Sequence, residues 1–333
     1  MNGLLSQLAH LELESPRLDE TVAFFTDVFG MHETERDGGR VYLRAWGDPF
    51  HHSLVVAEGE QAQLGHVGWR AAGTEQLEAA VSRLEELGYG EGWIEGDRGH
   101  GPAYRYRTPG GHLQEVFWQV ERFKAQPELR STFPVRVQKF SPVGVGVRQI
   151  DHVTVTTPAM NADIDFYRDV LGFRFMEYTV LEPASQEPFF AQLSNTEQAH
   201  DLALISDNSG MPARSHHFAY WVDQTHEVAR AADILMEAGV ALEYGPGKHG
   251  HGENSFLYVR EPSGHRVEVF SGGYRNYQPD WEPVRWVADE GGFDMHRNWP
   301  APDSLLKAFP SRDAPAAAVV DADVNPWALP GVS

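Results

Sequence analysis

Residues 151–173 read DHVTVTTPAMNADIDFYRDVLGF, and a similar stretch, AHLELESPRLDETVAFFTDVFGM, occupies residues 9–31. His152 aligns with His10, and the proline and the final glycine of the two stretches align at the same spacing along the chain. Each stretch begins with strand-like alternation of apolar and polar residues, turns at the proline and continues with helical periodicity up to the glycine. Such a repeat predicts two homologous modules in one chain.

Two further blocks recur in the same order. GHVGWR at residues 65–70 matches HHFAYW at 216–221, and PGGHLQEVF at 109–117 matches PSGHRVEVF at 262–270. Between the blocks, each module shows strand-like segments and one further helix with an apolar stripe, which in the first module is formed by Leu77, Val81, Leu84 and Leu87. The pattern predicts an α+β fold of two modules, each a pair of βαβββ units forming a curved mixed sheet.

The repeat also sets the expected boundaries. Residues 1–122 form the N-terminal module and residues 148–272 the C-terminal module, joined by a weakly periodic, proline-containing linker at 123–147. A C-terminal extension follows at 273–333. Its last part, from residue 313, is rich in alanine and proline, and we expect it to be disordered or to wrap a neighbouring subunit.

Composition narrows the classes of function. The 333 residues include 27 basic and 48 acidic side chains, a net charge of −21 that repels nucleic acid and anionic membranes alike. The N-terminus lacks a secretion signal and no apolar run could span a bilayer, so we expect a cytoplasmic location. There is no cysteine, which leaves histidine, aspartate and glutamate to carry any metal chemistry.

A candidate metal site follows from the repeat. Adjacent strand residues point to opposite faces, so only one of His216 and His217 is expected to face a given cavity, and alignment with His66 selects His217. His152, His217 and Glu268 are the residues that recur on three predicted strands. Two imidazoles and one carboxylate are typical of the facial triad that leaves iron(II) free positions for substrate and dioxygen.

At these residues the chain resembles the vicinal oxygen chelate superfamily, and within it the two-module extradiol ring-cleaving dioxygenases of the catechol 2,3-dioxygenase type. The resemblance covers most of residues 5 to 285 and is carried by QIDHVTV (149–155), QAHDLAL (198–204), RSHHFAYWV (214–222), YGPGKHGHGENSFLYVREPSGHRVEVFSGGY (244–274) and, in the first module, GGRVYLRAWGDPFHHSLVV (38–56).

The resemblance implies a non-haem iron(II) enzyme that uses O2 to open a catechol ring beside the diol, giving a 2-hydroxymuconic semialdehyde-type product in aromatic hydrocarbon catabolism. The implied ligands are His152, His217 and Glu268, which would also accept manganese(II). His200 matches the family's acid/base histidine, and His249 and Tyr258 match residues that line its pocket. The resemblance also implies a non-catalytic N-terminal module and a homo-oligomer, with a tetramer favoured.

Other functions stay open. A glyoxalase-like isomerase or lyase would use a comparable site, as would a dioxygenase dependent on a 2-oxo acid, whereas a sequestering protein would be expected to lack the triad. The matches at His200, His249 and Tyr258 favour ring cleavage. Among catechols, one with a small apolar substituent is our first expectation. A carboxylated substrate such as homoprotocatechuate would need a cation, and Arg214, Arg275, Arg285 and Arg297 are the candidates.

The first module raises a separate question. His10, His66 and Glu115 stand at its triad positions, and His52 falls near the position of His200. Arg105, however, replaces Tyr258, so the catalytic pocket is not duplicated. The sequence favours residual hydrogen bonding at this place over a second metal ion.

Overall fold

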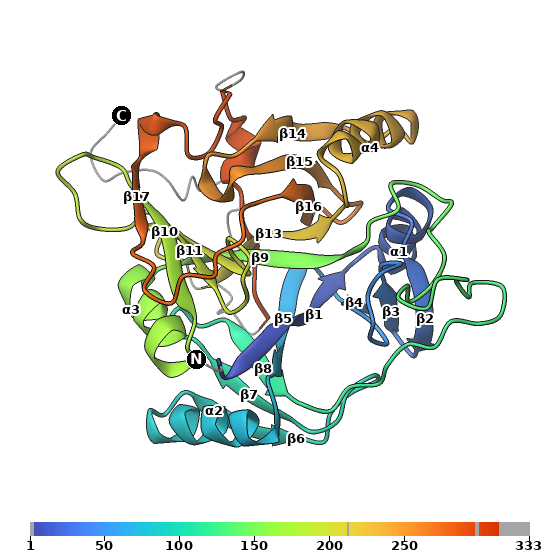
Figure 1. The fold of residues 1–333 in the computed structure, drawn as a ribbon, viewed down its shortest axis with the longest axis horizontal. Coiled ribbons are helices and arrows are strands. Elements are labelled where there is room, and N and C mark those ends of the chain that lie inside the picture. Colours follow the sequence, from blue (N-terminus) through green and yellow to red (C-terminus); the bar gives the residue numbers. More distant parts are fainter. Residues whose placement is uncertain (1–2, 212, 297–299, 313–333) are drawn as a thin grey trace.

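The computed structural model describes residues 3–211, 213–296 and 300–312. Both modules follow the predicted order of elements (Figure 1). The N-terminal module contains β1 (Leu5–Ser15), α1 (Leu18–Ala23), the π-helical turn η1 (Phe24–Val28), β2 (His32–Asp37), β3 (Arg40–Arg44), β4 (Leu54–Glu58), β5 (Gln63–Ala71), α2 (Thr74–Glu86), β6 (Gly90–Ile94), β7 (Ala103–Arg107) and β8 (Leu113–Phe117).

The C-terminal module repeats this order and adds short elements. It contains β9 (Gln149–Thr157), α3 (Met160–Asp165), the π-helical turn η2 (Phe166–Val170), β10 (Arg174–Val180), β11 (Phe190–Ser194), β12 (Leu202–Ser206), β13 (Arg214–Trp221), α4 (Thr225–Glu237), β14 (Leu242–Lys248), the 3₁₀ helix η3 (His251–Glu253), β15 (Asn254–Arg260) and β16 (Arg266–Gly272). The C-terminal extension adds β17 (Val284–Val287), the 3₁₀ helices η4 (Ala288–Glu290) and η5 (Asp303–Leu306), and β18 (Phe309–Pro310).

The strand order confirms the predicted fold class. One sheet runs β2-β3-β4-β1-β5-β8-β7-β6, and the other runs β14-β15-β16-β13-β9-β12-β11-β10-β17. In each sheet the first strands of the two βαβββ units, β1 with β5 and β9 with β13, pair antiparallel at the centre. This pairing brings the repeated histidines of one module onto neighbouring strands.

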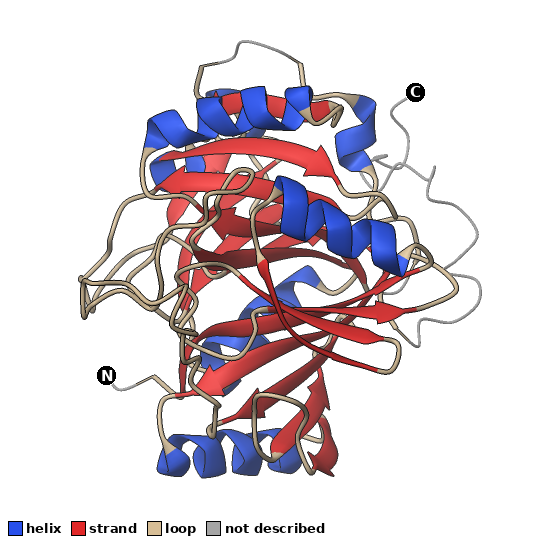
Figure 2. Ribbon diagram, turned by 90° about the vertical axis from the view of Figure 1, so that its right-hand side faces the viewer, coloured by secondary structure: helices blue, strands red, loops and turns tan. Residues whose placement is uncertain are grey.

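The helices cover the sheets from outside (Figure 2). In α2 the predicted stripe residues Leu77, Val81 and Leu84 are buried. The expectation that Leu87 belongs to the core is wrong, because α2 ends at Glu86 and Leu87, just beyond it, is 58% exposed. The stripe therefore stops one turn earlier than its periodicity suggests.

The two modules share one hydrophobic core, which includes residues of β1, β5, β9 and β13. Polar contacts also cross the boundary: the hydroxyls of Ser53 and Tyr220 lie 2.9 Å apart, and His265 Nε2 lies 2.9 Å from the carbonyl oxygen of Glu14. Both Ser53 and Tyr220 are buried. The relative placement of the modules is thus supported by packing and by specific hydrogen bonds.

The described part of the C-terminal extension packs on the second module. β17 adds a parallel strand beside β10, and β18 pairs antiparallel with β13. The segment from residue 313, for which we expected disorder or contact with a neighbour, lies outside the described residues. Among the helices of the described chain, none has the length and apolar character needed to cross a membrane.

Candidate metal centre

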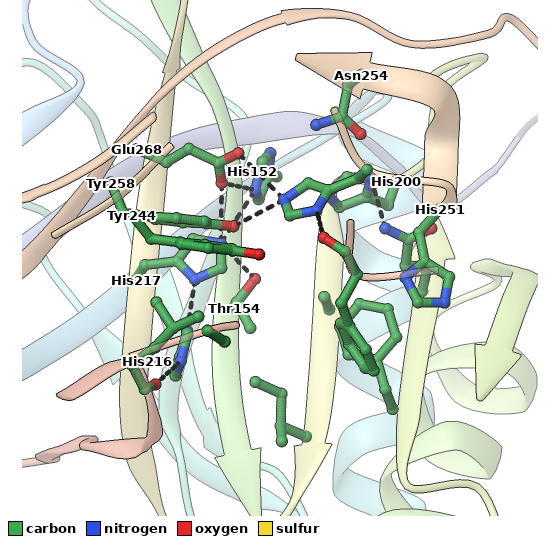
Figure 3. A pocket seen from close by; sticks show the side chains of 18 of the residues that line it. His152, Thr154, His200, His216, His217, Tyr244, His251, Asn254, Tyr258 and Glu268 are labelled. Carbon is green, nitrogen blue, oxygen red and sulfur yellow. Dashed lines mark hydrogen bonds and ion pairs between the residues drawn. The ribbon is translucent and has the colours of Figure 1, made fainter. Parts of the chain in front are cut away.

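Three side chains from adjacent strands meet in the C-terminal module (Figure 3). β13 lies between β9 and β16, and these strands carry His217, His152 and Glu268 respectively. The two Nε2 atoms are 3.3 Å apart, and Glu268 Oε2 lies 3.2 Å from His152 Nε2 and 3.1 Å from His217 Nε2. The structure thus brings together the three residues that the sequence predicted as metal ligands.

The separations suit a bound cation. Ligand atoms about 2.1 Å from one ion and at right angles to each other lie about 3.0 Å apart. The other carboxylate oxygen of Glu268, Oε1, is buried without a hydrogen-bond partner among the described residues, which is costly for a polar atom. Burial would raise the pKa of Glu268, but the two imidazoles outweigh it and hold that pKa well below its usual value. The donor set therefore fits a divalent metal ion.

A carboxylate orients the first histidine. His152 Nδ1 lies 2.8 Å from Asp151 Oδ1, so the ring donates there and leaves the Nε2 lone pair for the metal side. Burial disfavours the charged ring, yet the contacts with Asp151 and Glu268 raise the pKa of His152 to about 9, so a metal ion at Nε2 would have to displace a proton. Asp151 was missed in the sequence, although its position directly before a ligand histidine offered a signal.

A β-bulge positions the second histidine. The register of β13 against β9 shifts between Ser215 and His217, so strict alternation fails at this point. Both His216 and His217 consequently line the same cavity, and the expectation that only one of them faces it is wrong. His216 Nε2 donates to the carbonyl oxygen of Leu305 at 2.7 Å.

The Nδ1 atom of His216 then determines which ring nitrogen of His217 carries the proton. With the proton of His216 on Nε2, its Nδ1 accepts from His217 Nδ1 at 2.6 Å. The lone pair of His217 Nε2 is left to face Glu268 and His152. Burial is the main cause that lowers the pKa of His217 to about 4, so the ring is neutral, as a metal ligand must be.

His200 lies beside this triad, just before β12. Its ring centroid is 4.1 Å from that of His152, and its Nδ1 is 3.2 Å from the side-chain nitrogen of Gln192. Burial, followed by the charge of His152, holds the pKa of His200 well below its ordinary value. A neutral imidazole is thus placed at the edge of the candidate metal centre, where the sequence predicted an acid/base group.

His249 and Tyr258 complete the predicted set on the other side. His249 Nδ1 donates to the carbonyl oxygen of Phe293, so its Nε2 accepts from the Tyr258 hydroxyl at 3.1 Å. The His249 ring stacks on Phe256 with centroids 3.9 Å apart. Burial and then the negative charge of Glu268 raise the pKa of Tyr258 well above its ordinary value, so this hydroxyl keeps its proton.

These groups open into a cavity of about 300 Å³. Its walls away from the triad are largely apolar and include Phe189, Phe190, Ala203, Ile205, Phe293, Ala301, Leu305 and Leu306. Among its described lining residues there is no lysine or arginine. The cavity also contains the buried amide of Asn254, which has no hydrogen-bond partner within the described chain and which the sequence analysis did not single out.

The candidate cationic anchors lie elsewhere. Arg214 is buried in an ion pair with Asp207, at 2.6 Å, and Arg285 donates to backbone carbonyls of the loop before β11. Neither of these arginines nor Arg275 lines the cavity in the described structure. Arg297 lies outside the described residues.

Comparison with known proteins agrees with this geometry. The model of the Glyoxalase/Bleomycin resistance protein/Dioxygenase superfamily matches residues 7–116 and 149–269, and the chain belongs to that superfamily. The relatives it resembles over most of its length are extradiol dioxygenases, and this chain is one of that ring-cleaving group. The resemblance noted in the sequence motifs is thereby confirmed.

Three of these similarities cover nearly whole chains. The metapyrocatechase of Geobacillus stearothermophilus is 39% identical over 90% of this chain and 92% of its own. The manganese-dependent 2,3-dihydroxybiphenyl 1,2-dioxygenase of Geobacillus genomosp. 3 is 38% identical over 87% of this chain and 92% of its own. A substrate complex of homoprotocatechuate 2,3-dioxygenase from Brevibacterium fuscum superposes with a TM-score of 0.79 at 26% identity, covering 91% and 92% of the two chains.

Proposed function

We propose that this chain uses O2 to cleave a catechol ring beside the diol, with His152, His217 and Glu268 as ligands of iron(II) or manganese(II). The observation that carries the proposal is the convergence of that triad with His200 and Tyr258 at one end of a largely apolar cavity. A facial set of two histidines and one carboxylate would hold a redox-active ion and leave positions on it free for both substrate oxygens and dioxygen. The manganese-dependent relative makes either metal compatible with this chain.

His200 is proposed to move protons. Its ring is neutral near pH 7 because burial lowers its pKa, and Gln192 holds its Nδ1. A terminal amide can offer a ring nitrogen either its N–H or its carbonyl, so the contact with Gln192 is compatible with both neutral tautomers. His200 Nε2 can therefore release a proton towards the oxygen side of the site or accept one, as general acid–base catalysis requires.

Tyr258 and His249 are proposed to orient the substrate. The Tyr258 hydroxyl lies over the triad from β15, and its ring centroid is 5.0 Å from that of His217. Its bond to His249 fixes the direction of its proton, so the oxygen lone pairs remain to accept from a substrate hydroxyl. The apolar walls exclude water from the reacting groups, which strengthens these polar contacts.

The lining chemistry favours a catechol that is unsubstituted or bears an apolar group. A carboxylate arm would be desolvated among phenylalanine, leucine and isoleucine side chains with no lysine or arginine among the described lining residues to pair with it. Burial of an apolar substituent on the same walls is favourable, at about 25 cal/mol per Å². We therefore propose alkyl- or aryl-substituted catechols as substrates rather than carboxylated ones.

The test is an oxygen-uptake assay on anaerobically purified enzyme of known metal content. Catechol, 3-methylcatechol and 2,3-dihydroxybiphenyl are compared with 3,4-dihydroxyphenylacetate, and the yellow ring-opened product is followed in the visible range. We expect uptake with the first three and loss of both metal and uptake in His217→Ala. Intact metal without uptake on any catechol would reject the proposal, and preference for the carboxylated catechol would reject the substrate class.

We further propose a cytoplasmic homo-oligomer, a tetramer in the first instance, with residues 1–122 as a module that performs no ring cleavage. The segment 123–147 supports association, because its large apolar side chains Phe133, Val135 and Phe140 are 58%, 91% and 53% exposed. Light scattering coupled to size exclusion measures the assembly. A monomer at micromolar concentration would contradict it.

A further inference from the structure

The N-terminal module gathers a second set of metal-binding side chains. His10 on β1, His66 on β5 and Glu115 on β8 occupy the strands that correspond to β9, β13 and β16. Glu115 Oε1 lies 3.5 Å from Nε2 of His10 and 3.5 Å from Nε2 of His66, and these two nitrogens are 2.9 Å apart. All three residues are at least 97% buried.

A fourth group comes from a loop that the sequence analysis did not single out. His100 lies between β6 and β7, in the loop that corresponds to the one carrying His249 between β14 and β15. Its Nε2 is 3.3 Å from Glu115 Oε1, compared with 3.9 Å between His249 Nε2 and Glu268 Oε1 in the other module. His10, His100 and Glu115 each offer a ligand atom within 4.8 Å of the others.

The hydrogen bonds of this cluster leave a place that suits a cation. His100 Nδ1 donates to the carbonyl oxygen of Gly101 at 2.9 Å, so its Nε2 presents a lone pair to Glu115. Glu115 Oε1, which faces it, has no hydrogen-bond partner among the described residues. A bare imidazole nitrogen and a bare carboxylate oxygen repel each other at this distance unless positive charge lies between them.

The distances from Glu115 Oε1 suit a tetrahedral ion. Ligand atoms about 2.0 to 2.1 Å from zinc lie about 3.3 to 3.4 Å apart when the arrangement is tetrahedral. The three nitrogens lie 3.3, 3.5 and 3.5 Å from Glu115 Oε1. Glu115 Oε2 is occupied by Arg105, at 3.3 Å, which leaves Oε1 as the ligand atom.

We propose that the N-terminal module binds zinc(II) through Glu115, His10 and His100, with His66 Nε2 beside the site at 2.9 Å from His10 Nε2. His10 and Glu115 are at least 97% buried, so the ion is structural, in contrast to the triad of the C-terminal module, which lines a cavity. Arg105 in the place of Tyr258 is consistent with that assignment. The sequence analysis favoured residual hydrogen bonding at His10, His66 and Glu115 and did not consider His100.

The alternative to a zinc ion in this cluster is a proton on one of its histidines. Burial opposes a charge on His66, but Glu115 and Glu12 raise its pKa to about 9, so an imidazolium could neutralise the cluster. A protonated His66 would satisfy Glu115 from one side only and would leave the His100 Nε2 lone pair facing the carboxylate. Metal analysis separates the two states, because only the zinc state contributes a second ion per chain.

The experiment is metal analysis of the full-length enzyme expressed with iron and zinc and purified without chelator. We expect one zinc per chain in addition to the metal of the C-terminal module. His100→Ala and Glu115→Gln should lose the zinc and keep the other metal, whereas His217→Ala should do the reverse. His32→Gln, a histidine of the same module that bonds Gln138 outside the cluster, is the matched control and should lose neither.

Cobalt(II) gives a readout that does not involve activity. After chelation and reloading, a tetrahedral cobalt site should give an intense visible absorption that persists in His217→Ala and disappears in His100→Ala. A single metal per chain in the wild-type protein, or zinc content unchanged in both N-terminal variants, would overturn the proposal. Since the readout is independent of ring cleavage, failure of the proposed function would leave this result intact.

Discussion

The imidazoles of His216 and His217, although adjacent on one strand, meet Nδ1 to Nδ1 at 2.6 Å. A bulge in β13 makes this possible by turning both rings to the same side of the sheet. Through the bond from His216 to Leu305, the C-terminal extension reaches the candidate ligand His217. The extension therefore supports the metal centre from a segment far away in sequence.

Removal of His216 is expected to weaken metal binding without removing a ligand. His216→Ala leaves His217 Nδ1 without its acceptor, so iron affinity should fall about 10- to 100-fold. His216→Asn, whose carbonyl can accept the same proton, should lose less. Competition with a chelator measures the affinity, and His226→Ala on the exposed face of α4 is the control. Equal affinities in the Ala variant and the wild type would contradict the role of the bulge.

His200→Asn tests the acid/base role. We expect kcat for ring cleavage to fall about 10²- to 10⁴-fold, because the variant lacks the imidazole that lies beside His152 and is proposed to exchange the proton. The metal content should not change, since His200 is not a ligand. Oxygen uptake at saturating catechol and metal analysis of the same sample provide the two numbers. A variant with normal kcat would require another proton carrier.

How much the sequence could predict depends on whether a residue lies in the repeated strands. His152, His217 and Glu268 were found because their counterparts recur at matched positions, and the central strand pairing is a direct consequence of the βαβββ order. His200, His249 and Tyr258 came from the resemblance to a family. All six surround one cavity.

The residues that were missed depend on local backbone geometry or on long-range packing. The alternation of side chains assumed for a regular strand cannot reveal the bulge that turns the His216 side chain into the cavity. His100 lies in a loop whose length differs between the modules, and its Gly-His-Gly context at 99–101 recurs at 250–252, which pairs it with His251 rather than with a residue of the predicted triad. The Phe293 carbonyl that orients His249 belongs to the extension, and sequence periodicity contains no information about where that segment docks.

Tyr258→Phe tests the pocket hydrogen bond. The phenyl ring should keep its contact with His217, while the bond to His249 is lost, so we expect kcat/KM to fall about 5- to 10-fold, equivalent to about 1 kcal/mol. His249→Ala and the double variant complete a thermodynamic cycle. Strict additivity of the two single effects would show that Tyr258 and His249 act separately.

The contact between Ser53 and Tyr220 is expected to stabilise the association of the modules. Tyr220→Phe removes the tyrosine hydroxyl, whose oxygen lies 2.9 Å from that of Ser53, and so breaks this buried hydrogen bond. The free energy of unfolding should therefore fall by about 1 kcal/mol. Urea denaturation measures it, with Tyr277→Phe, at a site 77% exposed, as control. An equal change in the two variants would contradict a specific role for the inter-module bond.

Asp201 should make stability depend on pH in an unusual direction. Its carboxyl is 2% exposed, and burial, which outweighs bonds from Ser194 and the Thr196 backbone, raises its pKa from 3.8 to about 6. Because the folded state then favours the protonated form, the stability this group contributes is fully present below pH 3.8 and is lost as pH rises through 6. The shift corresponds to about 3 kcal/mol.

Asp201→Asn removes that titration. The free energy of unfolding of the variant minus that of the wild type should therefore increase by about 2.5 kcal/mol between pH 4 and pH 7, whatever its value at pH 4. Urea denaturation at several pH values measures the difference, and other carboxylates cancel because both proteins contain them. The control is Gln198→Ala, which removes only a hydrogen bond to Asp201. Asn195→Asp would not serve as a control, because it adds a charge. A difference that stays constant across this range would mean that Asp201 is ionised with an ordinary pKa in the folded protein, held by its hydrogen-bond donors against the cost of burial.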